Sequence, residues 1–417
     1  MLYPLLILLT YLRKLIKKEH PIRYKEKIFP YFFDVKRKLN TRLIWFHAAS
    51  IGEFKSILPL IYKLNTSKEN LEFLVTTVTL SSSKLAEKEF KTINNVQHRF
   101  FPIDVNFIIK KFLSSWRPDQ IFLVDSEIWP NLILEAKKRG IPVALLNARI
   151  TKKTFRRWKL VPFLTNKIFK SFDLCLSSNS ETSTYLKKFD AKNIYNLGNL
   201  KFVNQININE IQNINENFLT NNKFWLIAST HDGEENFCLK VHFLLKDKYK
   251  KIFTIIAPRH INRVKEIKNL CERLDLKCQV LDENDHISGE KEIIILNSFG
   301  VLSNYFKYSK SVFIGKSLLK RLRKDSGQNP IDAANFGCKI YHGPYVYNFR
   351  EVYDILGKNN ISKQINNIQE LAESLYLDFD NYDKEPKKVS DIMSKISDET
   401  LIKYTKYIDK FLKNEIS

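Results

Sequence analysis

Acidic side chains follow two apolar runs of this chain, at points where a buried strand would end. In residues 45–53 (WFHAASIGE), an apolar run gives way to small residues, a glycine and a single carboxylate, Glu53. Asp125 and Glu127 directly follow a second apolar run, residues 120–124. Carboxylates at strand ends can serve as general bases or stabilise charge, and neighbouring ones can divide acid and base roles. These three acids are the candidate catalytic residues.

Each acid also has an ordinary structural explanation. Glu53 could cap the helix that its own turn begins. Either Asp125 or Glu127 could cap a helix that starts near Pro130, because proline is favoured in the first helical turn. We expect one acid of this pair, and not both, to be that cap.

The apolar periodicity predicts αβ units in two series, which indicates doubly wound parallel sheets. Expected strands cover residues 43–47, 71–76, 120–124, 143–146, 174–177, 224–228, 252–257, 277–281, 292–296 and 311–314, with helices such as 131–139 and 400–412. The expected divisions are 1–20, a segment that associates with membranes; 21–203, a Rossmann-like domain; 204–222, a linker; and 223–417, a second Rossmann-like domain whose last helix could pack back on the first. Ligands of such folds bind at the carboxyl ends of the strands and at domain interfaces.

Several polar groups follow expected strands of the second half. Arg259, between Pro258 and a helical pattern, could clamp a phosphate with its guanidinium. Residues 229–235 (STHDGEE) repeat the transition from strand to helix, and Asp332 in residues 326–332 could accept ribose hydroxyls. Lys201, at the end of the first half, could offer a positive charge to a phosphate or carboxylate, although composition alone favours a solvated surface lysine.

Charge and composition narrow the class of protein. The formal net charge is +23, and residues 1–42 carry eleven Lys or Arg against three acids, directly after an uncharged run of twelve residues. That run is too short to span a bilayer, so it is expected to lie on an anionic membrane, with a buried N-terminal helix as the alternative.

Five scattered cysteines without a Cys-x-x-Cys pair favour neither a zinc site nor a disulfide framework. The absence of P-loop, GxGxxG, HExxH and Gly-x-Ser-x-Gly patterns argues against ATPases, dehydrogenases, zincins and α/β-hydrolases.

Eight segments in order resemble the bacterial lipid A Kdo transferases, or 3-deoxy-D-manno-octulosonic acid transferases. They are WFHAASIGE (45–53), DSEIWPN (125–131), NAR (147–149), GNLKF (198–202), STHDGEE (229–235), PRH (258–260), SGQNPIDAA (326–334) and HGPYVYNF (342–349). The chain departs from the family's pattern at three acidic positions, which are Asp125 and Asp332 in place of glutamate and Val301 in place of an acid.

The resemblance implies a GT-B glycosyltransferase with two Rossmann-like domains that face a cleft, without a metal or cofactor. It would move Kdo from CMP-Kdo to the lipid A precursor at the cytoplasmic face of the bacterial inner membrane, in lipopolysaccharide biosynthesis. Glu53 matches the catalytic base, and Asp125, Glu127 and Lys201 match positions that stabilise the transition state. The residues implied for CMP are Pro258, Arg259, Phe299, Gly300, Val301, Asn329, Pro330, Ile331 and Asp332. Those implied for the acceptor and cleft are Ser50, Gly52, Asn199, Ser229, Thr230 and His231.

Two other classes of protein share some of the features of a Kdo transferase. A GT-B transferase for another nucleotide sugar fits the same fold, since a fold alone does not set the donor. A basic nucleic-acid-binding protein would explain the net charge, but no RRM or helix-turn-helix signature is present and the charge gathers beside the apolar N-terminus. The sequence therefore favours a membrane-associated transferase without a nucleic-acid partner.

Overall fold

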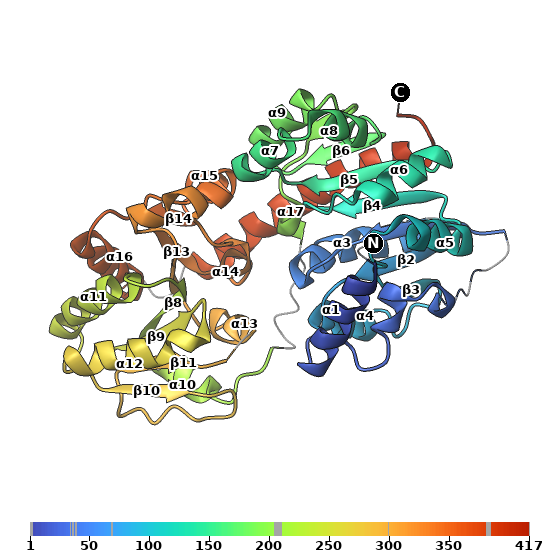
Figure 1. Cartoon of the computed structure of the whole chain (residues 1–417). Helices are drawn as coiled ribbons and strands as arrows, with labels where there is room; N and C mark the ends of the chain where they lie inside the picture. Colours follow the sequence, from blue (N-terminus) through green and yellow to red (C-terminus); the bar gives the residue numbers. More distant parts are fainter. Residues whose placement is uncertain are drawn as a thin grey trace. The chain divides into compact units, whose positions relative to one another are not determined.

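The computed structural model of the chain contains two compact α/β units (Figure 1). It describes residues 3–33, 35, 37, 40–67, 70–203, 211–298, 300–380 and 385–416. The first unit consists of Met1–Gln205 together with Ser397–Ser417, and the second of Ile206–Ile396. The first unit is therefore assembled from both ends of the chain.

The first unit is built on a parallel sheet of seven strands. They are β1 (Arg42–His47), β2 (Leu71–Thr77), β3 (Val96–Phe100), β4 (Gln120–Val124), β5 (Val143–Ala148), β6 (Leu174–Ser177) and β7 (Ile194–Asn196). Their order is β3-β2-β1-β4-β5-β6-β7, so the direction of winding reverses between β1 and β4. Such a reversal leaves a crevice at the carboxyl ends of the two central strands, where ligands of open α/β sheets bind.

Helices cover both faces of this sheet, which explains why its central strands are almost continuously apolar. They are α1 (Tyr3–Leu15), α2 (Lys25–Ile28), α3 (Ile51–Ser67), α4 (Leu80–Glu89), α5 (Asn106–Trp116), α6 (Pro130–Lys138), α7 (Lys152–Trp158), α8 (Pro162–Phe169) and α9 (Ser180–Lys188). One core joins the sheet to α3 and to the end of the chain through Phe54, Ile57, Tyr404, Ile408 and Phe411. The core on the other face contains residues of α5, α6 and α8.

The second unit repeats this design. Its strands are β8 (Phe224–Thr230), β9 (Phe253–Pro258), β10 (Cys278–Leu281), β11 (Ile293–Leu296), β12 (Ser311–Ile314), β13 (Lys339–His342) and β14 (Ser362–Gln364), in the order β10-β11-β9-β8-β12-β13-β14. Its helices are α10 (Glu216–Asn221), α11 (Glu234–Lys248), α12 (Val264–Arg273), α13 (Leu302–Phe306), α14 (Ile331–Asn335), α15 (Arg350–Lys358), α16 (Ile368–Asp380) and α17 (Glu385–Leu412), the last of which ends in the first unit. All strand pairs are parallel, and the winding reverses between β8 and β12.

The ten predicted strands are confirmed with ends shifted by two residues at most. Four strands were missed, which are β3, β7, β13 and β14. The last helix begins at Glu385 and not at residue 400, because its first half is rich in polar residues and carries little apolar periodicity. The helix predicted at 131–139 is α6, one residue earlier.

The N-terminal helix α1 lies on the surface of the first unit. Tyr3 anchors it, since its ring packs edge-on against Phe107 and its hydroxyl donates a hydrogen bond to the Ile28 carbonyl at 2.5 Å. Five of the six leucines of α1 are about half exposed, from 46% at Leu9 to 60% at Leu15, and Leu6 is less exposed. The alternative of a buried N-terminal helix is therefore wrong. Among the described helices, none is both long and apolar enough to cross a lipid bilayer.

Candidate active site

Glu53 lies in the first turn of α3, directly after the carboxyl end of β1. Its carboxylate accepts hydrogen bonds from the Ala49 backbone N–H and the Ser50 hydroxyl, both at 2.8 Å. Burial, together with the negative charges of Asp125 and Glu127, raises the pKa of the Glu53 carboxyl to about 7. A carboxylate with a pKa near neutrality can take a proton in one step and release it in the next.

Asp125 and Lys201 form an ion pair at the end of β4. Lys201 Nζ lies 3.0 Å from Asp125 Oδ2, and both side chains are largely buried. Asp125 has a φ of 62°, in the left-handed region that few residues other than glycine and asparagine adopt readily. Lys201 is therefore a partner of the acidic cluster and not the solvated surface lysine that its composition alone favoured.

Glu127 is held from two sides by aromatic residues. The Trp129 indole donates a hydrogen bond to Glu127 Oε2 at 2.9 Å, and His47 Nε2 lies 3.2 Å from the same oxygen. His47 is fully buried at the end of β1, and its ring stacks on Phe101 at 3.8 Å between centroids. Sequence reasoning missed His47, although a histidine that ends an apolar strand six residues before Glu53 was a usable signal.

Neither member of the Asp125 and Glu127 pair caps α6, so that prediction is wrong. Asp104 caps the helix instead, since its carboxylate accepts the backbone N–H groups of Asn131 and Leu132 at 2.9 Å each. Glu127 is oriented by Trp129 and His47, while Asp125 is paired with Lys201. Both acids are thus left for the site.

The loop that carries Lys201 is fixed by hydrogen bonds from three directions. The Asn147 side chain accepts the Leu200 N–H at 2.9 Å, and the Asn199 side chain accepts the Lys201 N–H at 3.0 Å. Tyr404 of α17 donates its hydroxyl to the Gly198 carbonyl at 2.9 Å. The C-terminal helix therefore positions the Lys201 loop, more than 200 residues away in the sequence, a role that sequence reasoning missed.

The predicted acceptor residues of the first unit have different surroundings. Ser50 is bonded to Glu53, and Asn199 supports the Lys201 loop. Gly52 is exposed in α3, and a Cβ atom built there would have no other atom within 4 Å.

In the second unit, a buried carboxylate organises the carboxyl ends of β8 and β12. Glu234 is fully buried and accepts hydrogen bonds from the backbone N–H groups of four residues: His231, Lys316, Ser317 and Leu318. Gly315 is required beside it, since a Cβ atom there would lie 2.7 Å from the Ser229 carbonyl oxygen. Glu234 therefore sets the shape of this sheet edge.

Three predicted cleft residues lie at this edge. Ser229 has a φ of 59°, and burial lowers the pKa of the adjacent His231. The Thr230 hydroxyl is buried and has no hydrogen-bond partner. These residues are close together in the second unit, whereas Ser50, Gly52 and Asn199 belong to the first.

The residues implied for CMP line the ends of neighbouring strands in the second unit. Pro258 ends β9, and the exposed Arg259 is tied to the edge through its backbone N–H, which donates to the Thr230 carbonyl at 3.1 Å. Val301 follows Gly300, whose φ is 80°, and it lines a cavity of about 190 Å³ beyond β10 and β11. Phe299 lies outside the described residues.

The last predicted group surrounds the start of α14. The Asn329 side chain accepts the Ile331 N–H at 3.1 Å, Pro330 and Ile331 are buried, and Asp332 lies in the first turn. Asn329 thus acts as a turn residue in addition to any contact with a ligand.

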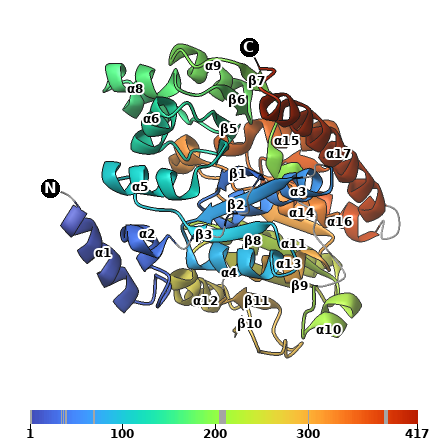
Figure 2. The ribbon, with the colours of Figure 1, turned by 90° about the vertical axis from the view of Figure 1, so that its right-hand side faces the viewer.

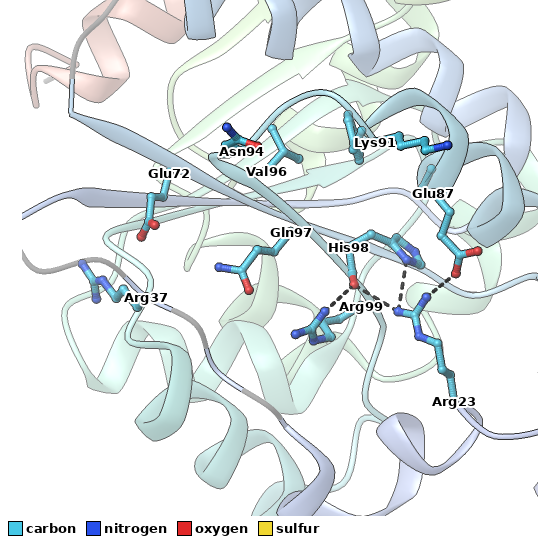
Figure 3. A pocket seen from close by; sticks show the side chains of 12 residues that line it. Arg23, Arg37, Glu72, Glu87, Lys91, Asn94, Val96, Gln97, His98 and Arg99 are labelled. Carbon is cyan, nitrogen blue, oxygen red and sulfur yellow. Dashed lines mark hydrogen bonds and ion pairs between the residues drawn. The ribbon is translucent and has the colours of Figure 1, made fainter.

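A larger cavity of about 680 Å³ opens at the edge strand β3, away from the carboxyl ends of β1 and β4 (Figure 3). Arginine side chains gather around it, but they hold the sheet edge. Arg23 is bonded to Glu26 and to the His98 carbonyl, and Arg37 to Asp119. Burial and the charges of Arg23 and Arg99 lower the pKa of His98 to about 3, so this histidine is neutral near pH 7. Nowhere in the described ranges do three His, Cys, Asp or Glu side chains gather as a metal site requires.

Two parallel α/β units, each with a topological switch point in its sheet, define a GT-B-like fold. The structure of a putative UDP-N-acetylglucosamine 2-epimerase from Listeria monocytogenes matches with a TM-score of 0.62 and 13% identity, over 90% of this chain and 97% of that one. That likeness concerns the fold.

Sequence comparisons give the family. A family model described as 3-deoxy-D-manno-octulosonic-acid transferase (kdotransferase) matches residues 23–204. The 3-deoxy-D-manno-octulosonic acid transferase of Rickettsia bellii is 31% identical over 98% of this chain and 97% of its own length. That of Haemophilus influenzae is 27% identical over 75% of this chain and 73% of its own. The chain belongs to the 3-deoxy-D-manno-octulosonic acid transferase family and is an enzyme of that class.

Replacing His47 by phenylalanine should lower the turnover number about tenfold and leave the KM for the donor unchanged. Phenylalanine keeps the stack on Phe101 but removes the nitrogen that faces Glu127, so the carboxylate loses one of its two supports. Steady-state kinetics would measure the split between kcat and KM. His47→Gln, whose amide can still donate toward Glu127, is the matched control and should recover most of the rate. Equal losses in both variants would contradict a positioning role.

Proposed function

We propose that this enzyme transfers Kdo from CMP-Kdo to the lipid A precursor, a step of lipopolysaccharide biosynthesis. The observation that carries the proposal is the position and ionisation of Glu53. It is a half-buried carboxylate with a pKa of about 7, at the switch point of the first sheet. Membership of the transferase family supports the sugar that is moved.

In the proposed reaction, Glu53 takes the proton from a hydroxyl group of the acceptor. The acceptor oxygen then attacks the anomeric carbon of Kdo, and the bond from that carbon to the phosphate oxygen breaks, so that CMP leaves with the electron pair. Lys201, which is paired with Asp125, supplies a positive charge to this cluster of acids, where it can stabilise negative charge that develops in the transition state. Glu127 contributes to the field that keeps the pKa of Glu53 high.

The donor is proposed to bind at the carboxyl edge of the second sheet. The exposed guanidinium of Arg259 is suited to the phosphate of CMP, because an arginine fork can bind two phosphate oxygens. The cavity of about 190 Å³ beside Val301 lies at the same edge. The loop of Lys316–Leu318, fixed by Glu234, and the turn at Asn329–Asp332 complete the proposed donor site.

The acceptor is proposed to reach the first unit from the cytoplasmic face of the inner membrane. The exposed leucines of α1 and the many cations that follow them would attach this unit to an anionic leaflet. Attachment would hold Glu53 near a substrate whose acyl chains stay in the bilayer.

A transfer assay read by mass spectrometry tests the proposed function. The purified enzyme is given CMP-Kdo, made in situ, and a tetraacylated glucosamine disaccharide 1,4′-bisphosphate in detergent. Kdo-bearing lipid is the expected product. Consumption of UDP-sugars with no use of CMP-Kdo would instead favour a GT-B transferase with another donor.

Removal of residues 1–18 should weaken membrane binding at least tenfold and leave CMP affinity within about twofold, because α1 contributes apolar surface to the first unit only. The cut leaves the buried ion pair of Glu19 and Lys27 in place. Sedimentation with anionic vesicles and calorimetric titration with CMP would measure the two effects. Equal losses in both would count against this division of roles.

A further inference from the structure

The first unit carries a second apolar surface, at the turn between α7 and α8. Leu160 and Phe163 are 80% and 84% exposed, and they are the two most exposed large apolar side chains of the described residues. Val161 and Leu164 beside them are 47% and 38% exposed. Residues 152–170, called here the α7–α8 corner, thus present four neighbouring apolar side chains to the surroundings.

This corner is a firmly built part of the fold. The Thr165 hydroxyl lies 2.6 Å from the Trp158 carbonyl oxygen and 2.9 Å from that of Val161, which closes the turn. The ring of Trp158 packs edge-on against Phe169 at 5.6 Å, so the corner is joined to the core. The outward direction of Leu160 and Phe163 is therefore fixed by packing behind them.

The charge around the corner has one sign. Residues 152–170 contain seven Lys or Arg and no Asp or Glu, and the nearest acids along the chain are Glu135 and Asp173. All seven cations are exposed, and Lys170 forms an ion pair with Asp190 at 3.2 Å. Apolar side chains ringed by cations match the interface of an anionic bilayer, where acyl chains lie beneath phosphate groups. If the corner instead bound a protein, we would expect that partner to present acidic side chains and a rim of neutral polar groups.

The corner and α1 lie on the same side of the first unit (Figure 2). Helix α5 adjoins α1, since its Phe107 contacts Tyr3 and is also 47% exposed.

We propose that the α7–α8 corner is a second membrane-docking element, which inserts Leu160 and Phe163 into an anionic leaflet beside α1. The inference rests on the proposed attachment of the enzyme to the membrane that holds its acceptor. Binding to a bilayer grows with the apolar area that is buried and with the attraction to anionic lipids, so a second apolar and basic element would strengthen the attachment that α1 provides. Two separated points of contact also fix how the first unit is turned on the membrane, which one helix cannot do.

Vesicle flotation of the full chain tests this inference. The double variant Leu160→Ser with Phe163→Ser should show a partition coefficient on vesicles of phosphatidylethanolamine and phosphatidylglycerol at least about tenfold lower than wild type. Leu377→Ser, at a 63% exposed leucine of α16 in the second unit, is the matched control and should bind as wild type. The triple variant Arg156→Gln, Arg157→Gln and Lys159→Gln should lose binding to these vesicles and change little on phosphatidylcholine alone.

Three results would overturn the inference. They are wild-type flotation of the double variant, an equal loss in the Leu377 control, and a change of oligomeric state in the double variant, which would make the corner an interface between copies of this chain. Transfer to an acceptor in detergent separates this test from the proposed function. A double variant that transfers Kdo normally in detergent but poorly on vesicles supports docking. If neither the wild type nor any variant transfers Kdo, but flotation still depends on Leu160 and Phe163, the docking surface is supported and the proposed reaction is contradicted.

Discussion

Replacing Glu53 by glutamine should lower the rate of Kdo transfer about a thousandfold and leave CMP affinity unchanged. Glutamine can keep the hydrogen bond from the Ala49 N–H, but it cannot take a proton from the acceptor. Single-turnover transfer and a separate titration with CMP would measure the two quantities. A loss of only a fewfold would mean that another group is the base.

The pH dependence of the wild-type rate follows from the same carboxyl. Because its pKa is about 7, the Glu53 carboxyl is mostly protonated at pH 6 and ionised at pH 8, so the rate should rise with pH and level off above about 8. Ser50→Ala removes a hydrogen bond that lowers this pKa, and it should move the midpoint of the profile upward while activity returns at high pH. An unchanged midpoint in this variant would contradict the assignment of the titrating group.

Stability provides an independent view of Glu53. Its pKa is raised on folding from 4.5 to about 7, so the folded state holds this proton over an interval where the unfolded state has lost it. The stability that the Glu53 carboxyl contributes to the folded state is fully present below about pH 4.5 and is lost as the pH rises through 7. Glu53→Gln should therefore stabilise the protein at pH 8 by roughly 3 kcal/mol and change little at pH 4. Urea unfolding at the two pH values would measure it.

Replacing Glu234 by alanine should destabilise the second unit by about 3–5 kcal/mol. The change leaves four backbone N–H groups without their acceptor in a buried place, and it opens a cavity beside Gly315. Urea unfolding would measure the loss, and hydrogen exchange should rise first at the amides of residues 316–318. CMP affinity should fall as well, since these residues form part of the proposed donor site.

The control for this variant is Glu266→Ala, whose carboxylate is on the surface and lies 3.4 Å from Arg263. A surface ion pair contributes little, so we expect a change below about 0.5 kcal/mol. If Glu234→Ala were no more destabilising than Glu266→Ala, the four hydrogen bonds would not be what holds this edge.

The sequence predicted the central strands because they are buried on both faces and read as apolar runs. The missed strands lie at or near the sheet edges and carry weaker patterns, since β7 and β14 have only three residues each and β3 alternates buried with half-buried side chains. A contact between distant segments has no local signal. Asp104 caps a helix 26 residues later, and Tyr404 reaches a carbonyl 206 residues away.

The candidate site, like the fold, could be predicted from the sequence only where its residues have a local signal. Glu53, Asp125 and Glu127 could be selected because they follow apolar runs, and the structure brings them together with Lys201. Asp125 stands where the related pattern has glutamate, and its shorter side chain still reaches Lys201 at 3.0 Å. His47 and Asn147 were not selected, because their roles depend on neighbours in other strands.

The return of α17 to the first unit has a consequence for how the protein is made. The ribosome completes the second unit before it releases Tyr404, Ile408 and Phe411, which belong to the core of the first. Domains generally fold as units in the order of synthesis, but here the first unit cannot be completed until the C-terminal helix has been made. During translation the Lys201 loop lacks its bond from Tyr404, so the nascent chain carries a complete second unit before its first unit is finished. A stop codon directly after the second unit would leave the first unit without the core residues and the Tyr404 hydrogen bond that α17 supplies.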